Sequence, residues 1–392
     1  MGFLIIGETF EFMKLHDARQ LPTFIKERIT RYGPVFRTSL FGRKAIISMD
    51  IELNVEIAKA ISACKESHKH VRNLTFQLLG PQGLKLRMVE DIDLLAHTYM
   101  KEGARNGFVN VKETSSKLWA KWNQRRQQLA LCWRYFPREW FQFSLNVPGN
   151  GVYRMMKARK LMMKLIKETI LKKRASGEEF GEFFKIIFGE TKSGADTMSI
   201  ENAIEYIYTF FLIANETTPG ILAAIVKLIN DHPKVKQELK REHDGISLIY
   251  IVINESLRIT STAPTVLRIT DHDFKFGDDT IPAGWIFMGY ANVHFNPEKY
   301  DDPLTFNPWR WKREDLGSIL SKTYIPFGAG SRLCVGAEFA KLQMAIFIHH
   351  LFRYRWSMKK ETTVLRRFML MFPCGSDVQI SEESKEDNSD GY

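Results

Sequence analysis

Apolar residues recur at three- and four-residue spacing along most of the chain, which is the pattern of helices with one buried face. The longest such segment begins after Ser199, a residue type that caps helices, and runs towards Asn230. The tripeptide Asp231-His232-Pro233 ends this helix and starts another. Residues 159–174 predict a further, basic amphipathic helix. The pattern therefore indicates a mainly helical protein with one long apolar helix.

Short segments of different composition predict small β-sheets beside the helices. Val35–Leu40 and Lys44–Met49 flank Phe41-Gly42-Arg43, which indicates a β-hairpin. Asp273–Ile281, with Gly277 near its centre, predicts a second hairpin. The chain of 392 residues is long for one domain, but its 44% hydrophobic content allows one large core.

The long helix carries a polar interruption. Glu216 and Thr217 follow the apolar run Tyr208–Ile213 and precede Pro219-Gly220. Proline removes a backbone donor and glycine loosens a helix, so we expect a distortion that frees carbonyl groups. The apolar run argues that the acid and the hydroxyl are buried, which favours a functional site over a solvated helix break.

A glycine-rich loop with one cysteine spans residues 326–336 and leads into an apolar helix over Ala337–Ile348. Cys334 would lie beside a helix N-terminus, where free N–H groups and the helix dipole favour a thiolate, so we expect a thiol pKa below its usual value of about 8.5. A thiolate is a soft metal ligand, and Arg332 adds a permanent cation. Three glycines allow a flat group to approach: Gly328, Gly330 and Gly336. A haem, with its iron and two propionates, fits each requirement.

Two further pairs of charged residues have helical spacing. Glu255 and Arg258 are three residues apart within the apolar segment Ile251–Leu257, which predicts a buried pair. His68 and Arg72 are four residues apart and would share one helix face. This second signal is weak by itself, because such pairs are common on protein surfaces.

Composition narrows the compartment and the class of partner. The four cysteines are far apart and show neither a disulfide framework nor paired metal spacing, so a reducing compartment is expected. The formal net charge of +11 allows nucleic acid, an anionic membrane surface or an acidic protein as partner. No nucleic-acid motif is present, and a basic solvated surface is the default interpretation. No window is expected to reach the roughly 20 apolar residues of a membrane-spanning helix.

The cysteine loop resembles the haem-thiolate signature of the cytochromes P450, Phe-x-x-Gly-x-Arg-x-Cys-x-Gly, over residues 327–336. The resemblance implies that Cys334 is the proximal iron ligand and that Phe327, Arg332 and Gly336 belong to the haem site. It also implies propionate contacts from His68 and Arg72 and from Arg268, which follows Ala263-Pro264 on a predicted strand.

Other segments of the chain carry the same resemblance. Glu216 and Thr217 match the acid–threonine pair that delivers protons during oxygen activation, although Ile213 and Ala214 depart from the small residue and glycine usual before it. Glu255, Arg258 and Arg310 match a buried three-residue network behind the haem. Ile286–Tyr290 and Val293–Glu298 are similar to the plant clan of brassinosteroid, gibberellin and triterpenoid oxidases.

The family likeness implies a mainly α fold with small β-sheets, in which haem b lies between the long distal helix and the Cys334 loop. One catalytic domain is expected over residues 1–376, followed by a disordered acidic tail over 377–392. The implied activity is monooxygenation of a hydrophobic terpenoid, triterpenoid or sterol-like substrate, with electrons from NADPH through a cytochrome P450 reductase.

The resemblance also bears on location. Plant members of the family usually carry an N-terminal anchor followed by a proline-rich hinge, and the resemblance implies the endoplasmic reticulum membrane, but both segments are missing from this sequence. We therefore expect a peripheral or cytosolic protein, for which contact with a membrane surface stays open and nucleic acid is not expected as a partner.

Three alternatives stay open. The chain could be a degenerate haem-binding relic without turnover, which two shortened segments favour: Ile61–Ser67, where the family has a longer roof over the substrate pocket, and Asp244–Ser247. It could instead be a haem-thiolate isomerase or dehydratase, against which the retained Glu216 and Thr217 argue. The remote alternative is a basic scaffold or nucleic-acid-binding protein without haem.

Overall fold

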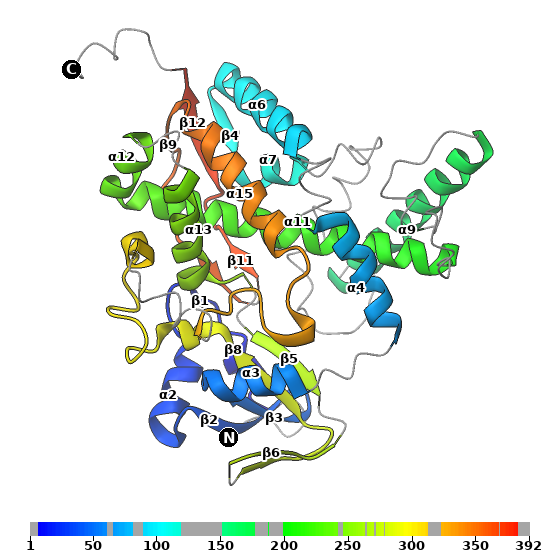
Figure 1. The fold of residues 1–392 in the computed structure, drawn as a ribbon, viewed down its shortest axis with the longest axis vertical. Helices are drawn as coiled ribbons and strands as arrows, with labels where there is room; N and C mark the ends of the chain where they lie inside the picture. The colour runs from blue at the N-terminus through cyan, green and yellow to red at the C-terminus, as the bar shows by residue number, and fades with distance from the viewer. Residues whose placement is uncertain are drawn as a thin grey trace.

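The computed structural model describes residues 7–60, 66–80, 89–118, 151–176, 187, 199–241, 246–262, 265–269, 272–277, 279–312, 323–367 and 369–382. Residues 61–65 of the shortened segment Ile61–Ser67 and residues 244–245 of the segment Asp244–Ser247 lie outside the described residues. The side chain of His68 is also outside the described part, although its backbone belongs to a helix. The described part is mainly helical with small sheets, as predicted (Figure 1).

The helices are α1 (Thr9–Phe12), α2 (Thr23–Tyr32), α3 (Ile51–Ala60), α4 (Glu66–Leu79), α6 (Val89–Asn106), α7 (Val111–Leu118), α9 (Gly151–Ser176), α11 (Ile200–Asp231), α12 (Pro233–Arg241), α13 (Ile246–Thr260) and α15 (Ala337–Leu351). Within the described ranges, 3₁₀ turns accompany them at η2 (Ala291–Phe295), η3 (Pro308–Lys312) and η4 (Gly330–Arg332). The strands are β1 (His16–Asp17), β2 (Val35–Leu40), β3 (Arg43–Ser48), β4 (Phe108–Asn110), β5 (Thr265–Ile269), β6 (Phe274–Phe276), β7 (Asp279–Ile281), β8 (Ile286–Tyr290), β9 (Arg355–Met358), β10 (Leu365–Arg366), β11 (Leu370–Met371) and β12 (Asp377–Ser381).

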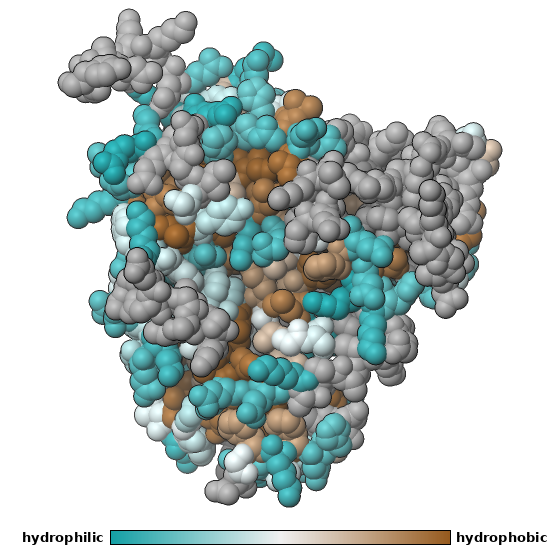
Figure 2. Space-filling view, viewed as in Figure 1, coloured by the Kyte–Doolittle hydropathy of each residue, from teal (hydrophilic) through white to brown (hydrophobic). Residues whose placement is uncertain are grey.

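Helix α11 is the central element of the fold (Figure 1). The side chain of Ser199 accepts a hydrogen bond from the backbone N–H of Asn202, which confirms the predicted N-cap. Residues 218–229 are buried without a break, and α11 packs against α7, α9, α13 and α15. In Figure 2, apolar residues gather towards the middle of the face shown, while hydrophilic residues dominate its rim. The long apolar run of the sequence is thus explained by a helix covered on all sides over its second half.

The larger sheet has the strand order β2-β3-β8-β5, in which β8 runs parallel to β3 and antiparallel to β5. Its β2–β3 hairpin turns at Phe41 and Gly42, whose φ angles are 55° and 73°. Two positive φ angles in a two-residue loop match the twist of the flanking strands. The second predicted hairpin is also observed, because β6 pairs with β7 around Gly277. Both sequence predictions of hairpins are therefore confirmed.

The expected C-terminal boundary at residue 376 is wrong. Residues 377–381 form β12, the central strand of a sheet with the order β4-β12-β9, and Val378 is fully buried. The strand is held by pairing with residues far away in the chain, which a local pattern does not reveal. The remainder of the expected tail, residues 383–392, lies outside the described part.

The expectation that no window resembles a membrane span also needs correction. Helix α11 contains an 18-residue window that is apolar enough to cross a membrane, by length and composition only. However, 67% of that window is buried inside the protein, as in the core helix of a soluble protein. This feature is therefore weak evidence for a membrane span.

Candidate active site

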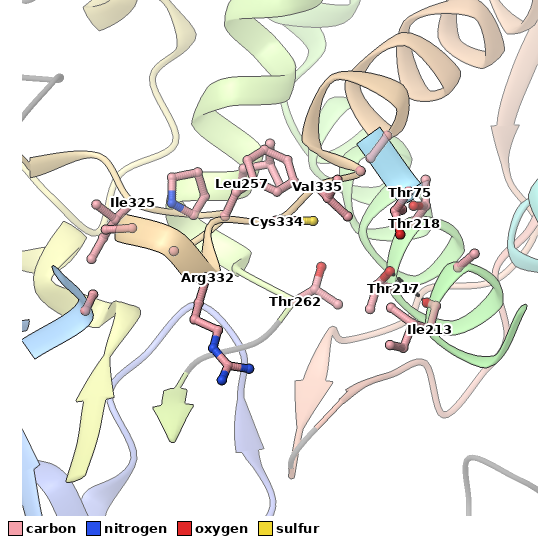
Figure 3. A pocket seen from close by; sticks show the side chains of 18 of the residues that line it. Thr75, Ile213, Thr217, Thr218, Leu257, Thr262, Ile325, Arg332, Cys334 and Val335 are labelled. Carbon is pink, nitrogen blue, oxygen red and sulfur yellow. Dashed lines mark hydrogen bonds between the residues drawn. The ribbon is translucent and has the colours of Figure 1, made fainter. Parts of the chain in front are cut away.

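A cavity of about 640 Å³ lies between α11 and the loop that precedes α15. Helices α3, α4, α13 and α15 and strands β5 and β8 also contribute to its wall, and most of the lining side chains are apolar. Cys334 stands on one side, and Thr217 and Thr218 of α11 stand on the other (Figure 3). The structure thus brings the predicted ligand loop and the polar segment of the long helix to one cavity.

Backbone hydrogen bonds fix the loop that carries Cys334. The N–H of Cys334 donates to the carbonyl of Phe327 at 2.9 Å, which closes the loop on itself. Gly328 has a φ of 81° and Gly336 caps the N-terminus of α15. Gly330 has a different task from the expected one, because an added Cβ would lie 2.4 Å from the carbonyl oxygen of Ala58. Gly330 therefore allows helix α3 to approach the loop, and only indirectly shapes the cavity.

The Cys334 side chain is accessible from the cavity that it lines. Burial raises the pKa of its thiol, while a hydrogen bond from the Gly336 backbone N–H and the charge of Arg72 act in the opposite direction. The prediction that the helix N-terminus holds this pKa below its usual value is therefore wrong. A metal ion deprotonates a coordinating thiol outright, so the thiolate would depend on the bound iron rather than on the loop alone.

The predicted propionate contacts are only partly assembled around the cavity. Arg268 and Arg332 line it, together with Phe327 and Gly336. Arg72 does not line the cavity: its Nη1 donates to the carbonyl of Leu333 at 2.6 Å. Arg72 therefore fixes the residue next to Cys334 and places a positive charge near the sulfur. The expected role of His68 cannot be assigned to a side-chain position, because that side chain is not among those described.

Glu216 and Thr217 diverge although they are neighbours in sequence. Thr217 lines the cavity, and its hydroxyl donates to the carbonyl of Ile213 at 2.9 Å. Glu216 lies outside the cavity lining and pairs with Lys112 of α7 at 2.9 Å. Burial raises the pKa of the Glu216 carboxyl, and Lys112 opposes this shift. The two residues therefore do not form one polar pair inside the cavity.

The distortion expected at Pro219 does not interrupt the helix, because α11 remains helical from Ile200 to Asp231. Proline lacks the N–H that would bond to the carbonyl of Asn215, so that carbonyl loses its usual helical partner while the helix continues. Ile213, which departs from the small residue of the family pattern, is 56% exposed and projects into the cavity. It narrows the space beside Thr217.

The three residues predicted to form a buried network are in contact. Arg258 donates to both carboxylate oxygens of Glu255 at 2.8 and 2.9 Å, and the Nε of Arg310 donates to the same carboxylate at 3.0 Å. Glu255 is 0% exposed. The two guanidinium groups also donate to carbonyl oxygens of η2 and of the segment 301–305 before η3, so the network ties α13 to both.

Sequence reasoning missed several partners of this framework. The indole N–H of Trp311 and the backbone N–H of Asn307 donate to Glu255, each at 2.9 Å. The Nε2 of the buried His294 accepts a hydrogen bond from the N–H of Ile325 at 3.0 Å, just before the Cys334 loop. Burial lowers the pKa of His294 to about 3, so the ring is neutral. No pattern in the sequence indicates that His294 is buried, because its burial depends on the packing of η2 against the segment that precedes the Cys334 loop.

The residues present fit a haem on three observations. A cysteine sulfur opens into a largely apolar cavity, two arginines line the same cavity, and backbone glycines leave room beside the sulfur. Soft thiolate ligands can hold haem iron, and guanidinium groups suit carboxylates such as propionates. Among the described residues, no cluster of three His, Cys, Asp or Glu offers a site for a bare metal ion.

Comparison with known proteins gives consistent matches over nearly the whole chain. The family model described as Cytochrome P450 matches residues 110–376. Cytochrome P450 708A2 of Arabidopsis thaliana is 32% identical, over 97% of this chain and 91% of the relative. Two hydroxylases are 28% identical, and each is covered over 92% of its length: cucurbitadienol 11-hydroxylase of Siraitia grosvenorii and beta-amyrin 16-alpha-hydroxylase of Maesa lanceolata. The solved structure of cyanobacterial CYP120A1 with bound retinoic acid superposes with a TM-score of 0.81 at 19% identity, over 98% of both chains, and shares the fold.

Proposed function

Since this chain belongs to the cytochrome P450 family and is a monooxygenase of that family, we propose that it hydroxylates a hydrophobic terpenoid, triterpenoid or sterol-like substrate. The substrate class is supported by relatives named for hydroxylation of cucurbitadienol, beta-amyrin and steroids. The largely apolar lining of the cavity suits such molecules, which bury most of their surface on binding.

The observation that carries the proposal is the placement of Cys334 across one cavity from Thr217. Cys334 would hold the haem iron, and Arg268 and Arg332 would bind its propionates. When bound, the haem supplies the oxygen-activating chemistry. Thr217 would hold a proton donor or water in the cavity, because its hydroxyl donates to Ile213 and leaves its oxygen as an acceptor. The apolar walls would exclude bulk water from this region.

Electrons would come from NADPH through a cytochrome P450 reductase. The net charge of +11 on this chain would favour association with a reductase that presents an acidic surface. The same charge would favour attachment to the anionic surface of the endoplasmic reticulum. Salt-sensitive sedimentation with that membrane would support this location, and recovery in the soluble fraction at low salt would contradict it.

The test of function is reconstitution of the holoprotein with a plant cytochrome P450 reductase, NADPH and dioxygen. Cucurbitadienol, beta-amyrin and a sterol form the first substrate panel, and product mass is measured. The proposal expects a gain of one oxygen atom that depends on NADPH. Full haem loading without any oxygenated product from this panel would reject the proposed substrate class.

A second candidate, haem binding with little coupled turnover, rests on a different observation. The alignment with the Arabidopsis relative spans 437 positions, which exceeds the 392 residues of this chain, so internal positions of the relative have no counterpart here. The shortened segment at Ile61–Ser67 would leave the substrate poorly enclosed, and poor enclosure admits water. Comparing product formed per NADPH before and after grafting the longer segment of a relative separates the two candidates.

A further inference from the structure

One pair of hydroxyl groups stands out in the apolar wall of the cavity. Thr75 of α4 and Tyr206 of α11 both line the cavity, and their oxygen atoms are 2.7 Å apart. Val71, Leu79 and Phe210 are among the apolar side chains that line the same cavity, and Thr209 adds a further hydroxyl group to the lining. A polar group in such a wall is a natural determinant of how a ligand is oriented.

The direction of hydrogen bonding in this pair follows from a third group. The Thr75 hydroxyl also lies 2.8 Å from the carbonyl oxygen of Val71, which can only accept. The single proton of Thr75 therefore points to Val71, and Tyr206 donates its own proton to Thr75. This leaves lone pairs on the Tyr206 oxygen, to which no donor is found among the described residues. A ligand that satisfies this oxygen must supply a donor, as an alcohol does and a ketone does not.

Along α11, Tyr206 lies about three turns before Thr217. Tyr206, Phe210, Ile213 and Thr217 line the cavity from one side of α11. With a rise of about 1.5 Å per residue, Tyr206 is about 16 Å from Thr217 along the helix axis. An elongated ligand held by a hydroxyl group at Tyr206 would present its opposite end to Thr217 and Cys334.

We propose that Tyr206, oriented by Thr75, accepts a hydrogen bond from the hydroxyl group of a terpenoid or sterol alcohol and thereby selects alcohols over the matching ketones. This inference rests on the proposed function and names the group by which the substrate is recognised. Its consequence for regiochemistry is that oxidation falls on carbons remote from the recognised hydroxyl group.

The test uses haem-loaded protein and two matched ligand pairs: cucurbitadienol and beta-amyrin, each with the ketone formed by oxidation of its hydroxyl group. Dissociation constants are measured by calorimetry and by the change in the haem spectrum. One neutral hydrogen bond changes affinity by roughly two- to twelvefold, so the wild type should prefer the alcohols by a factor in that range. Tyr206→Phe should bind alcohol and ketone alike, with ketone affinity changed less than about twofold.

Thr75→Val gives a second, independent variant. It frees the Tyr206 proton to donate to a ketone, so the alcohol preference should shrink or reverse while Tyr206 is still present. The matched control is Tyr208→Phe, which removes a hydroxyl group from the same helix at a buried position outside the cavity lining. This control should keep the wild-type preference.

Three results would overturn the inference. The first is an unchanged alcohol preference in both Tyr206→Phe and Thr75→Val, and the second is an equal loss of alcohol preference in Tyr208→Phe. The third is failure of the wild type to bind either alcohol. The carbon monoxide spectrum of the same samples keeps the two proposals apart. A normal thiolate-type spectrum with no alcohol preference rejects the role of Tyr206 and leaves the monooxygenase assignment untouched.

Discussion

Replacing Glu255 with alanine tests the buried network quantitatively. The Glu255 carboxylate accepts hydrogen bonds from Arg258, Arg310, Trp311 and the backbone of Asn307, and none of its surface is exposed. The substitution leaves two guanidinium groups buried without their counter-charge. Removing one partner of a buried ion pair costs about 3–5 kcal/mol. The total free energy of unfolding of a protein is about 5–15 kcal/mol. The loss would therefore leave the variant only marginally stable.

The matched control is Glu238→Ala. Glu238 and Arg241 are also three residues apart on one helix and also 2.8 Å apart, but their side chains are 36% and 71% exposed. Exposed pairs of this kind contribute about 0–1 kcal/mol. Urea unfolding of both variants, followed by circular dichroism, should therefore show a large decrease in the free energy of unfolding for Glu255→Ala and almost no decrease for Glu238→Ala. A loss in Glu255→Ala that does not exceed the control by about 2 kcal/mol would refute the buried-network account.

Two further predictions concern the cavity and pH. Thr217→Ala should keep the haem but lower the amount of product formed per NADPH, because positioned proton transfer contributes about 10²–10⁴-fold to the rate. The control is Thr169→Ala, which removes a hydroxyl-to-backbone hydrogen bond of the same kind on α9. Equal product yields in both variants would count against the role of Thr217. His294 has a pKa of about 3 in the folded protein, against the ordinary value of 6.5 in the unfolded chain. Its contribution to the free energy of unfolding is therefore complete above pH 6.5 and is lost as the pH falls towards 3, by up to about 1.4 kcal/mol per pH unit. His294→Gln, which retains an acceptor for the Ile325 N–H, should flatten this part of the pH–stability curve, and identical slopes in urea unfolding between pH 6.5 and 4.5 would exclude the effect.

The parts of the site that the sequence predicted are those with fixed local spacing. The Cys334 loop and the Glu255–Arg258 pair are set within a few residues, so their chemistry is readable before folding. The partners of these groups come from distant segments. Glu216 turns to Lys112, which is 104 residues away, and His294 bonds to Ile325, which is 31 residues away. Neither contact leaves a periodic signal in the chain.

The errors of the sequence analysis have the same physical origin. The helix N-terminus alone predicts a lowered pKa for the Cys334 thiol, whereas burial by the surrounding elements has the larger effect. The loop pattern assigns Gly330 to a flat cofactor, whereas this glycine accommodates the backbone of Ala58. The sequence predicts a tail at strand β12, because the pairing of this strand with β4 and β9 is non-local. Each error concerns what a residue packs against, which local spacing does not specify.

The central claim is that Cys334 binds haem iron as a thiolate, and the most direct measurement is the absorption spectrum of the reduced carbon monoxide complex. The wild type should show the red-shifted Soret band of a thiolate ligand. Cys334→Ser should lose that band, whereas Cys374→Ser, which removes the other exposed free cysteine of the described residues, should keep it. A thiolate-type band that survives in Cys334→Ser, or that is absent from haem-loaded wild type, would contradict the account.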